Sequence, residues 1–515
     1  MITTREVVEQ SEREGAGQAP LHFDVVIIGA GISGIDAAYR IQRGNKKLSY
    51  VILEGRKTIG GTWDLFRYPG IRSDSDMATL GFPFHPWREE NMIAGGTDIR
   101  NYVERTARTY GIDRHIRYDH KVVSAQWSTE DVQWTVVCDV AGTRTAFTCG
   151  FLYSCTGYYD YKNGYAPQWQ GMANFAGTIV YPQFWPSDLD YGGKRVVVVG
   201  SGATAVTIVP AMAATAAHVT MLQRSPSYII SLPSRDKLTN ALRKRLPQPI
   251  ADTVIRWKNI ALSSFIYVLS RKRPERVRKL IRQGVIASIG PAYDAEKHDV
   301  DTHFNPKYNP WDQRLCLVPD GDLFKSLASG KASVETGTIA EFTANGVRLE
   351  SGKELPADIV VSATGLMLQL FGGVELTVDG RLVDASRRLV YKGSLVEGVP
   401  NFAFSFGYTN ASWTLKVDLN ARFVSKLLRY MRKNRKAIVV PKTSSADIPR
   451  EPLLNLSSGY VRRAAHIMPQ QGPVPWRVVQ NYFLDFAAHL TGRFNDGTLH
   501  FYKAPKKAKR RGRAA

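Results

Sequence analysis

The chain has 515 residues and a formal net charge of +22; 44% of its residues are hydrophobic and 22% are charged. This length exceeds one ordinary domain and leaves room for two or three with substantial cores, and the composition is that of a globular protein. None of the four cysteines belongs to a CxxC pair, which excludes a zinc ribbon and a dithiol redox centre and fits a reducing cytosol.

Residues 1–20 are polar and acidic, so we expect a flexible leader and not a signal peptide, which would need an apolar core. The longest uncharged run of the central basic region, Asn259–Ser270, is shorter than the roughly 20 residues of a membrane-spanning helix. A cytoplasmic protein is therefore expected.

The first glycine-rich motif lies near the N-terminus. An apolar strand runs into Gly29-Ala-Gly31-Ile-Ser-Gly34, helical periodicity follows, and a second apolar strand ends at Glu54, about 20 residues beyond the glycines. In this context the glycines bring the backbone close to a pyrophosphate at a helix N-terminus, and the acid accepts hydrogen bonds from ribose hydroxyls. Because an acid disfavours a 2′-phosphate, we expect FAD or NAD here.

The sequence GGTW at 60–63 follows Glu54, and RYPGIRSD at 67–74 comes next. Backbone without side chains can pass closely over a large flat ligand, so the first segment is expected to cover the ring system of the cofactor. Asp74 is either an ordinary turn residue or the group that sets the protonation and position of a neighbouring arginine.

The second glycine motif, GSGATA at 200–205, again follows an apolar strand, and its third glycine is replaced by alanine, a tolerated variant. The next strand ends not in an acid but in Gln-Arg224-Ser225. A planar cation beside a hydroxyl suits a 2′-phosphate, so we expect NADPH here unless Arg224 is an ordinary surface arginine.

An extended segment that ends in Thr-Gly occurs twice, at Gly157 and at Gly365, which indicates internal duplication of the fold. The predicted fold class is α/β, with two doubly wound, Rossmann-like dinucleotide-binding domains and a helical insertion. The expected parts are the leader (1–20), the first part of the FAD-binding domain (21–165), the NADPH-binding domain (166–355) with the insertion at about 235–300, the second part of the FAD-binding domain with a C-terminal segment (356–500), and a basic tail (501–515).

Two basic regions lie outside the nucleotide motifs. Residues 235–282 carry RKR at 243–245 and again at 271–273, interleaved with apolar residues at helical spacing. They form either an interfacial helix pair or a helical insertion whose charged face is merely solvated. The tail either holds acidic lipid or nucleic acid or is a solubilising end.

Together these motifs resemble those of the class B flavoprotein monooxygenases, and within them the Baeyer–Villiger monooxygenases of the actinobacterial ethionamide-activating type. The resemblance covers about residues 22–500. Beside the two glycine motifs, GGTW and RYPGIRSD, it rests on FAGTIVYPQFWP (175–186), YNPWDQRLCLVP (308–319) and GYTNASWTLK (407–416).

The resemblance implies FAD and NADPH as cofactors. It implies two catalytic residues: Arg314, which would stabilise the flavin peroxide, and Asp74, which would orient that arginine. The expected cofactor-binding residues are Gly29, Gly31, Gly34, Glu54, Gly61, Thr62, Trp63, Asp74, Gly200, Gly202, Ala203, Thr204, Arg224 and Ser225; no metal is expected. The sequence departs from the family at Tyr181, where the connector has histidine, which puts coupling and NADPH handling in doubt more than reaction type, and at Gln313, which is often lysine.

The implied reaction inserts one oxygen atom of O2 into a ketone to give an ester, and oxygenates sulfides and thioamides as a second output. The expected partners are O2 and a small lipophilic ketone or organosulfur substrate, without nucleic acid, and with a peripheral contact at the inner face of the membrane. Two alternatives stay open: an S- or N-oxygenating flavin monooxygenase with little ketone activity, and a basic membrane-associated binding protein. The missing CxxC argues against a flavin disulfide reductase.

Overall fold

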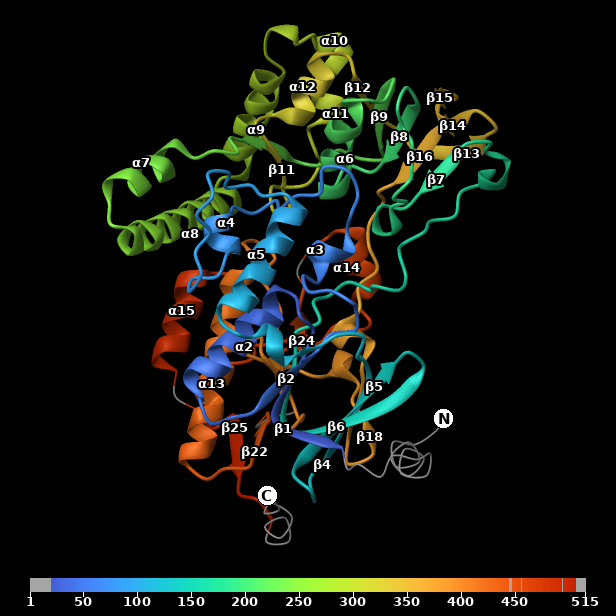
Figure 1. Cartoon of the computed structure of the whole chain (residues 1–515). Coiled ribbons are helices and arrows are strands. Elements are labelled where there is room, and N and C mark those ends of the chain that lie inside the picture. The colour runs from blue at the N-terminus through green and yellow to red at the C-terminus, as the bar shows by residue number, and fades with distance from the viewer. Residues whose placement is uncertain (1–19, 444–446, 455, 493, 506–515) are drawn as a thin grey trace.

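The computed structural model describes residues 20–443, 447–454, 456–492 and 494–505. The predicted leader up to residue 19 and the tail from residue 506 therefore lie outside the described residues. Figure 1 shows two units, one above the other, joined by chain segments that cross between them.

The first unit, the lower one in Figure 1, is built on an eleven-stranded mixed sheet. Its strands are β1 (Leu21–Ile28), β2 (Tyr50–Leu53), β3 (Ile116–Arg117), β4 (Lys121–Ser128), β5 (Gln133–Val140), β6 (Thr143–Ser154), β17 (Glu375–Val378), β18 (Arg381–Leu382), β19 (Val390–Tyr391), β20 (Leu395–Val396) and β21 (Phe402–Phe404). Strands β3, β2, β1, β6 and β21 pair in parallel in this order, while β4, β5 and β6 form an antiparallel meander. The continuous apolar run of β1 is buried over its last four residues, as expected for a parallel strand covered on both faces.

The second unit, the upper one, is built on a five-stranded sheet that is parallel throughout. In spatial order its strands are β12 (Ala332–Thr336), β9 (His218–Gln223), β8 (Arg195–Val199), β16 (Ile359–Ser362) and β7 (Thr178–Val180). The remaining strands form small separate sheets: β10 (Ile229–Leu232) with β11 (Cys316–Pro319); β13 (Ile339–Thr343), β14 (Gly346–Leu349) and β15 (Glu354–Pro356); β22 (Ile438–Pro441) with β25 (Leu499–Tyr502); and β23 (Glu451–Pro452) with β24 (Gln470–Gln471). Two doubly wound units are thus present, which confirms the predicted fold class.

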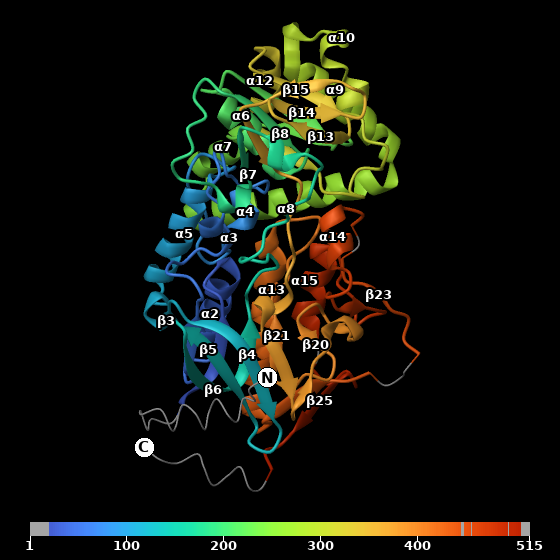
Figure 2. The ribbon, with the colours of Figure 1, turned by 90° about the vertical axis from the view of Figure 1, so that its right-hand side faces the viewer.

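Helices cover both sheets and bridge the two units, as the turned view of Figure 2 shows. The α-helices are α2 (Ile32–Gly44), α3 (Thr62–Leu65), α4 (Met77–Leu80), α5 (Gly96–Thr109), α6 (Ala203–Ala213), α7 (Lys237–Arg245), α8 (Gln248–Lys272), α9 (Pro274–Ile289), α10 (Ala295–His298), α11 (Val300–His303), α12 (Asp322–Ala328), α13 (Trp413–Lys433), α14 (Gly459–Ala464) and α15 (Tyr482–Thr491). Short 3₁₀ turns occur at Asp113–His115, Met172–Asn174, Pro182–Phe184, Gly290–Ala292, Leu370–Gly373 and Ala385–Arg387. Helices α2 and α13 pack against each other on the first sheet, so the helix after the first glycine motif is held by the last third of the chain.

Helices α7 to α11 are inserted between β10 and β11 of the second unit. The long α8 leaves that unit and packs on the first one, where Ile260 joins a cluster with Tyr408 and Leu415. Within the described ranges, no helix is long and apolar enough to cross a membrane.

Two chain segments that cross between the units run side by side. The Asp160 amide donates to the Met367 carbonyl at 2.9 Å, and the Gln369 amide donates to the Tyr158 carbonyl at the same distance. This pairing fixes Tyr158 and Tyr159 at the level where the two units meet.

Candidate active site

A cavity of about 1090 Å³ lies between the two units. Its volume exceeds the roughly 300–1,000 Å³ of a pocket for one drug-sized ligand, as expected for a site that takes two dinucleotides. Its lining includes these predicted site residues: Gly29, Gly31, Glu54, Gly61, Thr62, Trp63, Asp74, Gly200, Gly202, Ala203, Thr204, Arg224, Ser225 and Arg314.

Gly34 is the predicted residue that does not line this cavity. It is buried in α2, where an added Cβ would lie only 1.9 Å from the Gly29 carbonyl oxygen. Glycine is required at this position because α2 packs closely on the first glycine turn. This is the usual role of the third glycine in such motifs.

The two glycine turns have matching geometry. Gly29 has φ +100° and an added Cβ would lie 2.7 Å from the Cys155 carbonyl oxygen; Gly200 has φ +138° and an added Cβ would lie 2.3 Å from that of Ala363. Their amides also match. The Gly29 amide donates to the Leu53 carbonyl and the Gly200 amide to the Leu222 carbonyl, each at 2.8 Å and each near the end of the next strand. The duplication predicted from the two Thr-Gly endings therefore extends to atomic contacts, and only glycine fits at either turn.

Both glycine loops end in helix N-termini that could receive a pyrophosphate. Glycine occupies the N-cap of α2 (Gly31) and of α6 (Gly202), and in the part of the chain that the structure describes neither helix receives a side-chain cap. An added Cβ on Gly202 would meet nothing within 4 Å. The free amides and the open space suit the phosphates of a dinucleotide in each unit.

Glu54 lies at the end of β2 with 6% of its surface exposed. Its carboxylate accepts hydrogen bonds from the amides of Ala30, at 2.7 Å, and Arg56, at 2.9 Å. Each oxygen keeps a further lone pair for a ribose hydroxyl. Burial raises the pKa of Glu54, although the two backbone hydrogen bonds act against this.

The GGTW segment packs directly on the first glycine loop, since an added Cβ on Gly61 would lie 3.1 Å from the Gly31 Cα. The segment is anchored by Asp64, which is buried and pairs with Arg56 at 2.6 Å and with Arg67 at 2.8 Å. Arg67 is therefore committed to Asp64 and does not pair with Asp74.

The RYPGIRSD segment belongs to the first unit by sequence but is held by the second. Tyr68 is buried in the apolar cluster of the second unit, and Arg72 forms an ion pair with Asp322 of α12. Gly70, at φ +75°, lies so close to α6 that an added Cβ would be 2.8 Å from the Ala211 Cβ and 2.9 Å from the Thr207 carbonyl oxygen. The segment thus joins the two units and carries Asp74 to their interface.

Asp74 pairs with Arg314, with 3.1 Å between a carboxylate oxygen and a guanidinium nitrogen. The negative charge of Asp74 raises the pKa of Arg314 further above its usual value, and Tyr158, Tyr159 and Tyr460 act in the same direction. The structure therefore places a permanently charged guanidinium in the cavity wall, held by an acid of the other unit.

The loop that carries Arg314 is fixed from two sides. The Asp312 carbonyl accepts from the Ser457 amide at 3.0 Å, and the Asp312 carboxylate pairs with Arg271 at the end of α8 at 2.6 Å. The ring of Trp311 meets that of Tyr267, also on α8, with 5.5 Å between centroids. Helix α8 is thus in direct contact with the loop that presents Arg314.

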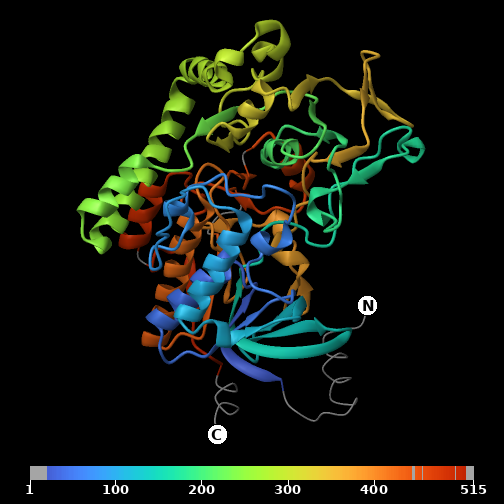
Figure 3. The same ribbon diagram turned by 45° about the horizontal axis from the view of Figure 1, so that its top comes forward.

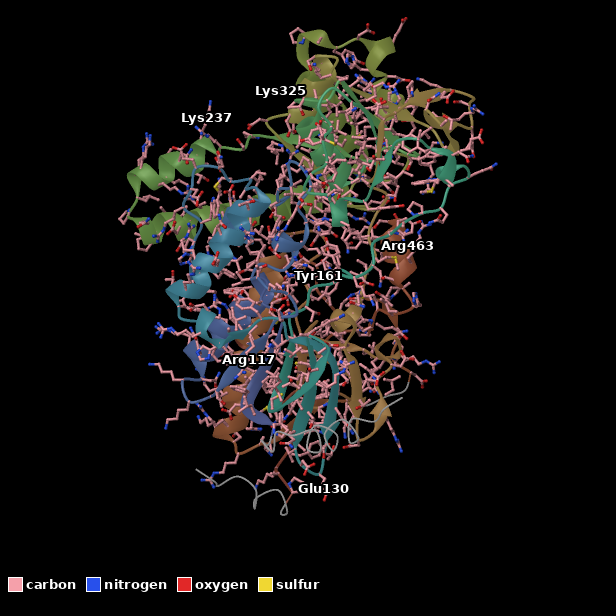
Figure 4. The ribbon with its side chains drawn as sticks, turned by 45° about the vertical axis from the view of Figure 1, so that its right-hand side comes forward. Arg117, Glu130, Tyr161, Lys237, Lys325 and Arg463 are labelled. Atoms are coloured by element: carbon pink, nitrogen blue, oxygen red, sulfur yellow. The ribbon has the colours of Figure 1, made fainter. Side chains whose placement is uncertain are left out.

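Residue-by-residue reasoning missed an aromatic group in the cavity wall. Tyr158 and Tyr159 share a hydrogen bond of 2.9 Å between hydroxyls, and burial raises the pKa of Tyr158 to about 12. Their position directly after the first Thr-Gly ending was the available signal. Tyr460, on α14, gave no such signal. Figure 4 shows two further lining residues, Tyr161 and Arg463, at the level where the units meet.

The GYTNASWT segment reaches the same cavity. The Trp413 ring lies 5.0 Å from that of Tyr158, and its Nε1 donates to the Ser33 hydroxyl on α2 at 3.0 Å. This polar turn thus joins the first glycine helix to the tyrosines beside Arg314.

Arg224 is exposed to the cavity and has no hydrogen-bond or ion-pair partner among the described residues, which leaves its guanidinium free for a phosphate. Gln313 also lines the cavity, whereas Tyr181 does not. In the described part of the chain, no group of three or more His, Cys, Asp or Glu side chains is placed to hold a metal ion.

The chain is similar to known proteins over most of its length. The model of the flavin-binding monooxygenase-like family matches residues 22–375. The chain is 52% identical over 486 residues to the FAD-containing monooxygenase EthA of Mycobacterium tuberculosis, covering 94% of this chain and 98% of that protein. It is 50% identical over 484 residues to EthA of Mycolicibacterium smegmatis, covering 94% and 97%.

Among solved structures, an oxidised steroid monooxygenase bound to NADP superposes with a TM-score of 0.72 at 21% identity, covering 94% of this chain and all of the other. At that identity the likeness concerns the fold. With most of its length matched by the family model and half of its residues shared with EthA, this chain belongs to the flavin-binding monooxygenase-like family and is a flavin-dependent monooxygenase.

Proposed function

We propose that this monooxygenase, which uses FAD and NADPH, inserts one oxygen atom of O2 into ketones to give esters, the Baeyer–Villiger reaction. The observation that carries the proposal is the pair of Arg314 and Asp74 in the wall of a cavity that both glycine loops line. The catalytic roles proposed for Arg314 and Asp74 both depend on this contact.

The chain's own groups fit both cofactors. The residues that would hold FAD are Gly29, Gly31, Gly34, Glu54, Gly61, Thr62, Trp63 and Asp74, and those that would hold NADPH are Gly200, Gly202, Ala203, Thr204, Arg224 and Ser225. Bound FAD would supply the reduced ring that activates O2, with NADPH as the source of electrons. The protein contributes orientation, exclusion of water and a fixed positive charge.

Arg314 is the proposed electrostatic catalyst. Oxygen insertion into a ketone builds negative charge on the carbonyl oxygen of the substrate, and a preorganised cation stabilises such charge strongly in a site that excludes water. Asp74 would hold the guanidinium in place. Oxygenation of a sulfide or thioamide builds no such charge on the substrate, so the pair favours the ketone reaction, with sulfur oxygenation as a second output of the same site.

We further propose small lipophilic ketones and organosulfur compounds as substrates, and a cytoplasmic enzyme in peripheral contact with the inner face of the membrane. Support comes from the long, partly exposed α8, which packs on the cavity-lining Tyr408 through Ile260 and contacts the Arg314 loop.

NADPH consumption by the FAD-loaded protein in air tests the reaction, with a long-chain aliphatic ketone present or absent and with ester and hydrogen peroxide measured together. Ester formed in step with NADPH supports the proposal. Sulfoxide from a dialkyl sulfide, with no ester from any linear ketone, would show instead the S-oxygenating alternative.

A further inference from the structure

Helix α8 presents an apolar stripe to solvent. Its members follow one another at helical spacing along about five turns, and they are Ile250, Val254, Trp257, Ala261, Phe265 and Val268, with Leu262 and Ile266 beside them. The exposed fraction reaches 63% for Phe265 and 52% for Leu262. Of the two alternatives that the sequence left open for this region, a merely solvated charged face is excluded for α8.

The charged groups in the middle of α8 are engaged by the rest of the protein. Asp252 is paired with Arg88, Lys258 is paired with Asp236, and Arg256 donates to the carbonyls of Ala78 and Gly81 at 2.8 Å. The middle of the helix therefore uses its charges to attach to the protein, and no unpaired charge lies there among the described residues.

Helix α15 continues this face. The ring of Trp257 on α8 lies 5.9 Å from that of Phe483 and 5.5 Å from that of Phe486, and Figure 3 shows the two helices side by side on one flank. The charges of α15 are also turned inward, because Asp485 is buried and paired with Lys416 at 2.7 Å. Phe483, Leu484, Ala487 and Ala488 are exposed on the outside. We call the outer faces of α8 and α15 the flank surface.

Basic residues border the flank surface at the helix ends. They are exposed and form no ion pair within the described ranges: Lys244 and Arg245 at the end of α7, Lys272 and Arg273 at the end of α8, and Arg276 and Lys279 on α9. The whole chain carries a net charge of +22. An apolar face with a cationic border is the pattern of a surface that inserts at the headgroup level of an anionic bilayer.

We infer that the flank surface docks on an anionic membrane, with the apolar side chains of α8 and α15 among the acyl chains and the basic border on the lipid phosphates. A twofold contact between two copies would bring the two basic borders together, so like charges would repel. The inference rests on the peripheral contact proposed above and gives it residues. It also places the Arg314 loop, which α8 holds through Arg271 and Tyr267, next to the lipid phase from which a lipophilic substrate would enter.

Co-sedimentation of the full-length, FAD-loaded protein with vesicles tests this. The vesicles contain either phosphatidylcholine alone or phosphatidylcholine and phosphatidylglycerol in equal parts, at low and at high salt. Binding is expected to the anionic vesicles at low salt and to weaken with added salt. The double variant Leu262→Ser/Phe265→Ser should bind about tenfold less or weaker still, because two inserted side chains are lost.

The chain offers a matched control, Leu21→Ser/Leu382→Ser, whose leucines are exposed by 50% and 63% but lie on strands of the first sheet. This control should bind as the natural chain does, and Lys272→Ala/Arg273→Ala should bind less and with a shallower dependence on salt. Equal binding by the Leu262→Ser/Phe265→Ser variant, or no binding by the natural chain, would overturn the inference.

Sedimentation velocity separates the competing occupant, a second copy of the chain. A natural chain that is dimeric and a Leu262→Ser/Phe265→Ser variant that is monomeric, neither bound to vesicles, would assign the flank surface to a protein interface and overturn the membrane inference. Ester formation from a water-soluble ketone reports on the proposed reaction separately, and the same variant should keep it unchanged.

Discussion

A guanidinium nitrogen of Arg314 lies 3.1 Å from a carboxylate oxygen of Asp74, although the first residue precedes β11 of the second unit and the other ends a segment of the first. The contact forms only when the two units hold their observed relation, because Tyr68 and Gly70 dock the Asp74 segment on the second unit. The position of the Arg314 charge in the cavity therefore depends on how the two units are arranged.

Replacing Arg314 should separate oxygen use from oxygen transfer. We expect Arg314→Ala to lower ester formation by about 10²–10³-fold, the usual cost of removing a preorganised charge from a site of this kind, while NADPH is still consumed and hydrogen peroxide is released. Asp74→Asn, which leaves the cation but loosens its position, should lower ester formation about tenfold. Parallel assays of NADPH, ester and peroxide give the comparison.

Arg67→Ala is the matched control for that experiment. Arg67 belongs to the same RYPGIRSD segment but pairs with Asp64 and does not line the cavity. Its ester yield per NADPH should stay close to that of the natural chain; an equal loss in both arginine variants would mean that the segment, and not the Arg314 charge, is what matters.

Gly70→Ala should weaken the contact between the units. The added methyl group would meet the Ala211 Cβ and the Thr207 carbonyl, and the residue would also keep a left-handed backbone that alanine disfavours. Gly111→Ala isolates the effect of the left-handed backbone, since Gly111 has a similar φ of +66° but an added Cβ there would meet nothing within 4 Å.

We expect Gly111→Ala to cost about 1 kcal/mol and Gly70→Ala about 1–3 kcal/mol more, from overpacking at the interface. Thermal melts of both variants give the difference, and only Gly70→Ala should also slow the reduction of bound flavin by NADPH. Equal melting temperatures for the two would contradict an interface role for Gly70.

The fold class and both glycine motifs could be predicted because their signals are local: a strand, three or four small residues and a helix. The partner of Asp74 could not be read in this way. The arginines beside it in sequence, Arg67 and Arg72, are bound to Asp64 and Asp322, and only the resemblance to a family pointed to Arg314.

Periodicity alone could not say which side of α8 faces water either. A helix with both apolar and charged residues normally turns the charges outward. Here Arg256 and Lys258 are held by the protein, because carbonyls of the first unit and Asp236, the N-cap of α7, receive them. That choice depends on tertiary contacts that no local pattern contains.

Glu54 makes the stability of the cofactor-free protein depend on pH. Burial raises its pKa, so the folded chain prefers the protonated form, and this contribution is present below the unfolded-state pKa and is lost as the pH rises through the folded-state pKa. Glu54→Gln should remove this component. The melting temperature of the variant, relative to the natural chain, should therefore rise as the pH is increased from acid to neutral.

The affinity of the natural chain for FAD should change with pH in the direction opposite to that of the Glu54 contribution to stability. The ionised carboxylate has more acceptor sites for ribose hydroxyls than the acid has, so FAD binding by the natural chain should weaken as the pH falls through the raised pKa. Glu54→Gln should bind FAD about tenfold more weakly at neutral pH, with little dependence on pH in this range. Glu130→Gln, at an exposed turn, is the control and should behave as the natural chain does in both measurements.

Arg224→Ala should change the choice of nicotinamide cofactor. Losing a charge-assisted hydrogen bond to the 2′-phosphate should raise KM for NADPH about 10–100-fold and leave KM for NADH nearly unchanged, because NADH has no group there. Arg224→Lys keeps the charge but not the planar guanidinium. Its KM for NADPH should therefore lie between that of the natural chain and that of Arg224→Ala. A parallel rise for both cofactors would show that Arg224 only shapes the loop.

Tyr181→His tests whether the departure from the family connector matters. Tyr181 precedes a 3₁₀ turn and does not line the cavity. We therefore expect the yield of ester per NADPH and the rate of flavin reduction to change by no more than about twofold, the range typical of substitutions away from a site. Stopped-flow reduction of the bound flavin and the ratio of ester to peroxide measure the two quantities, and a several-fold gain in both on introducing histidine would show that the natural tyrosine limits coupling.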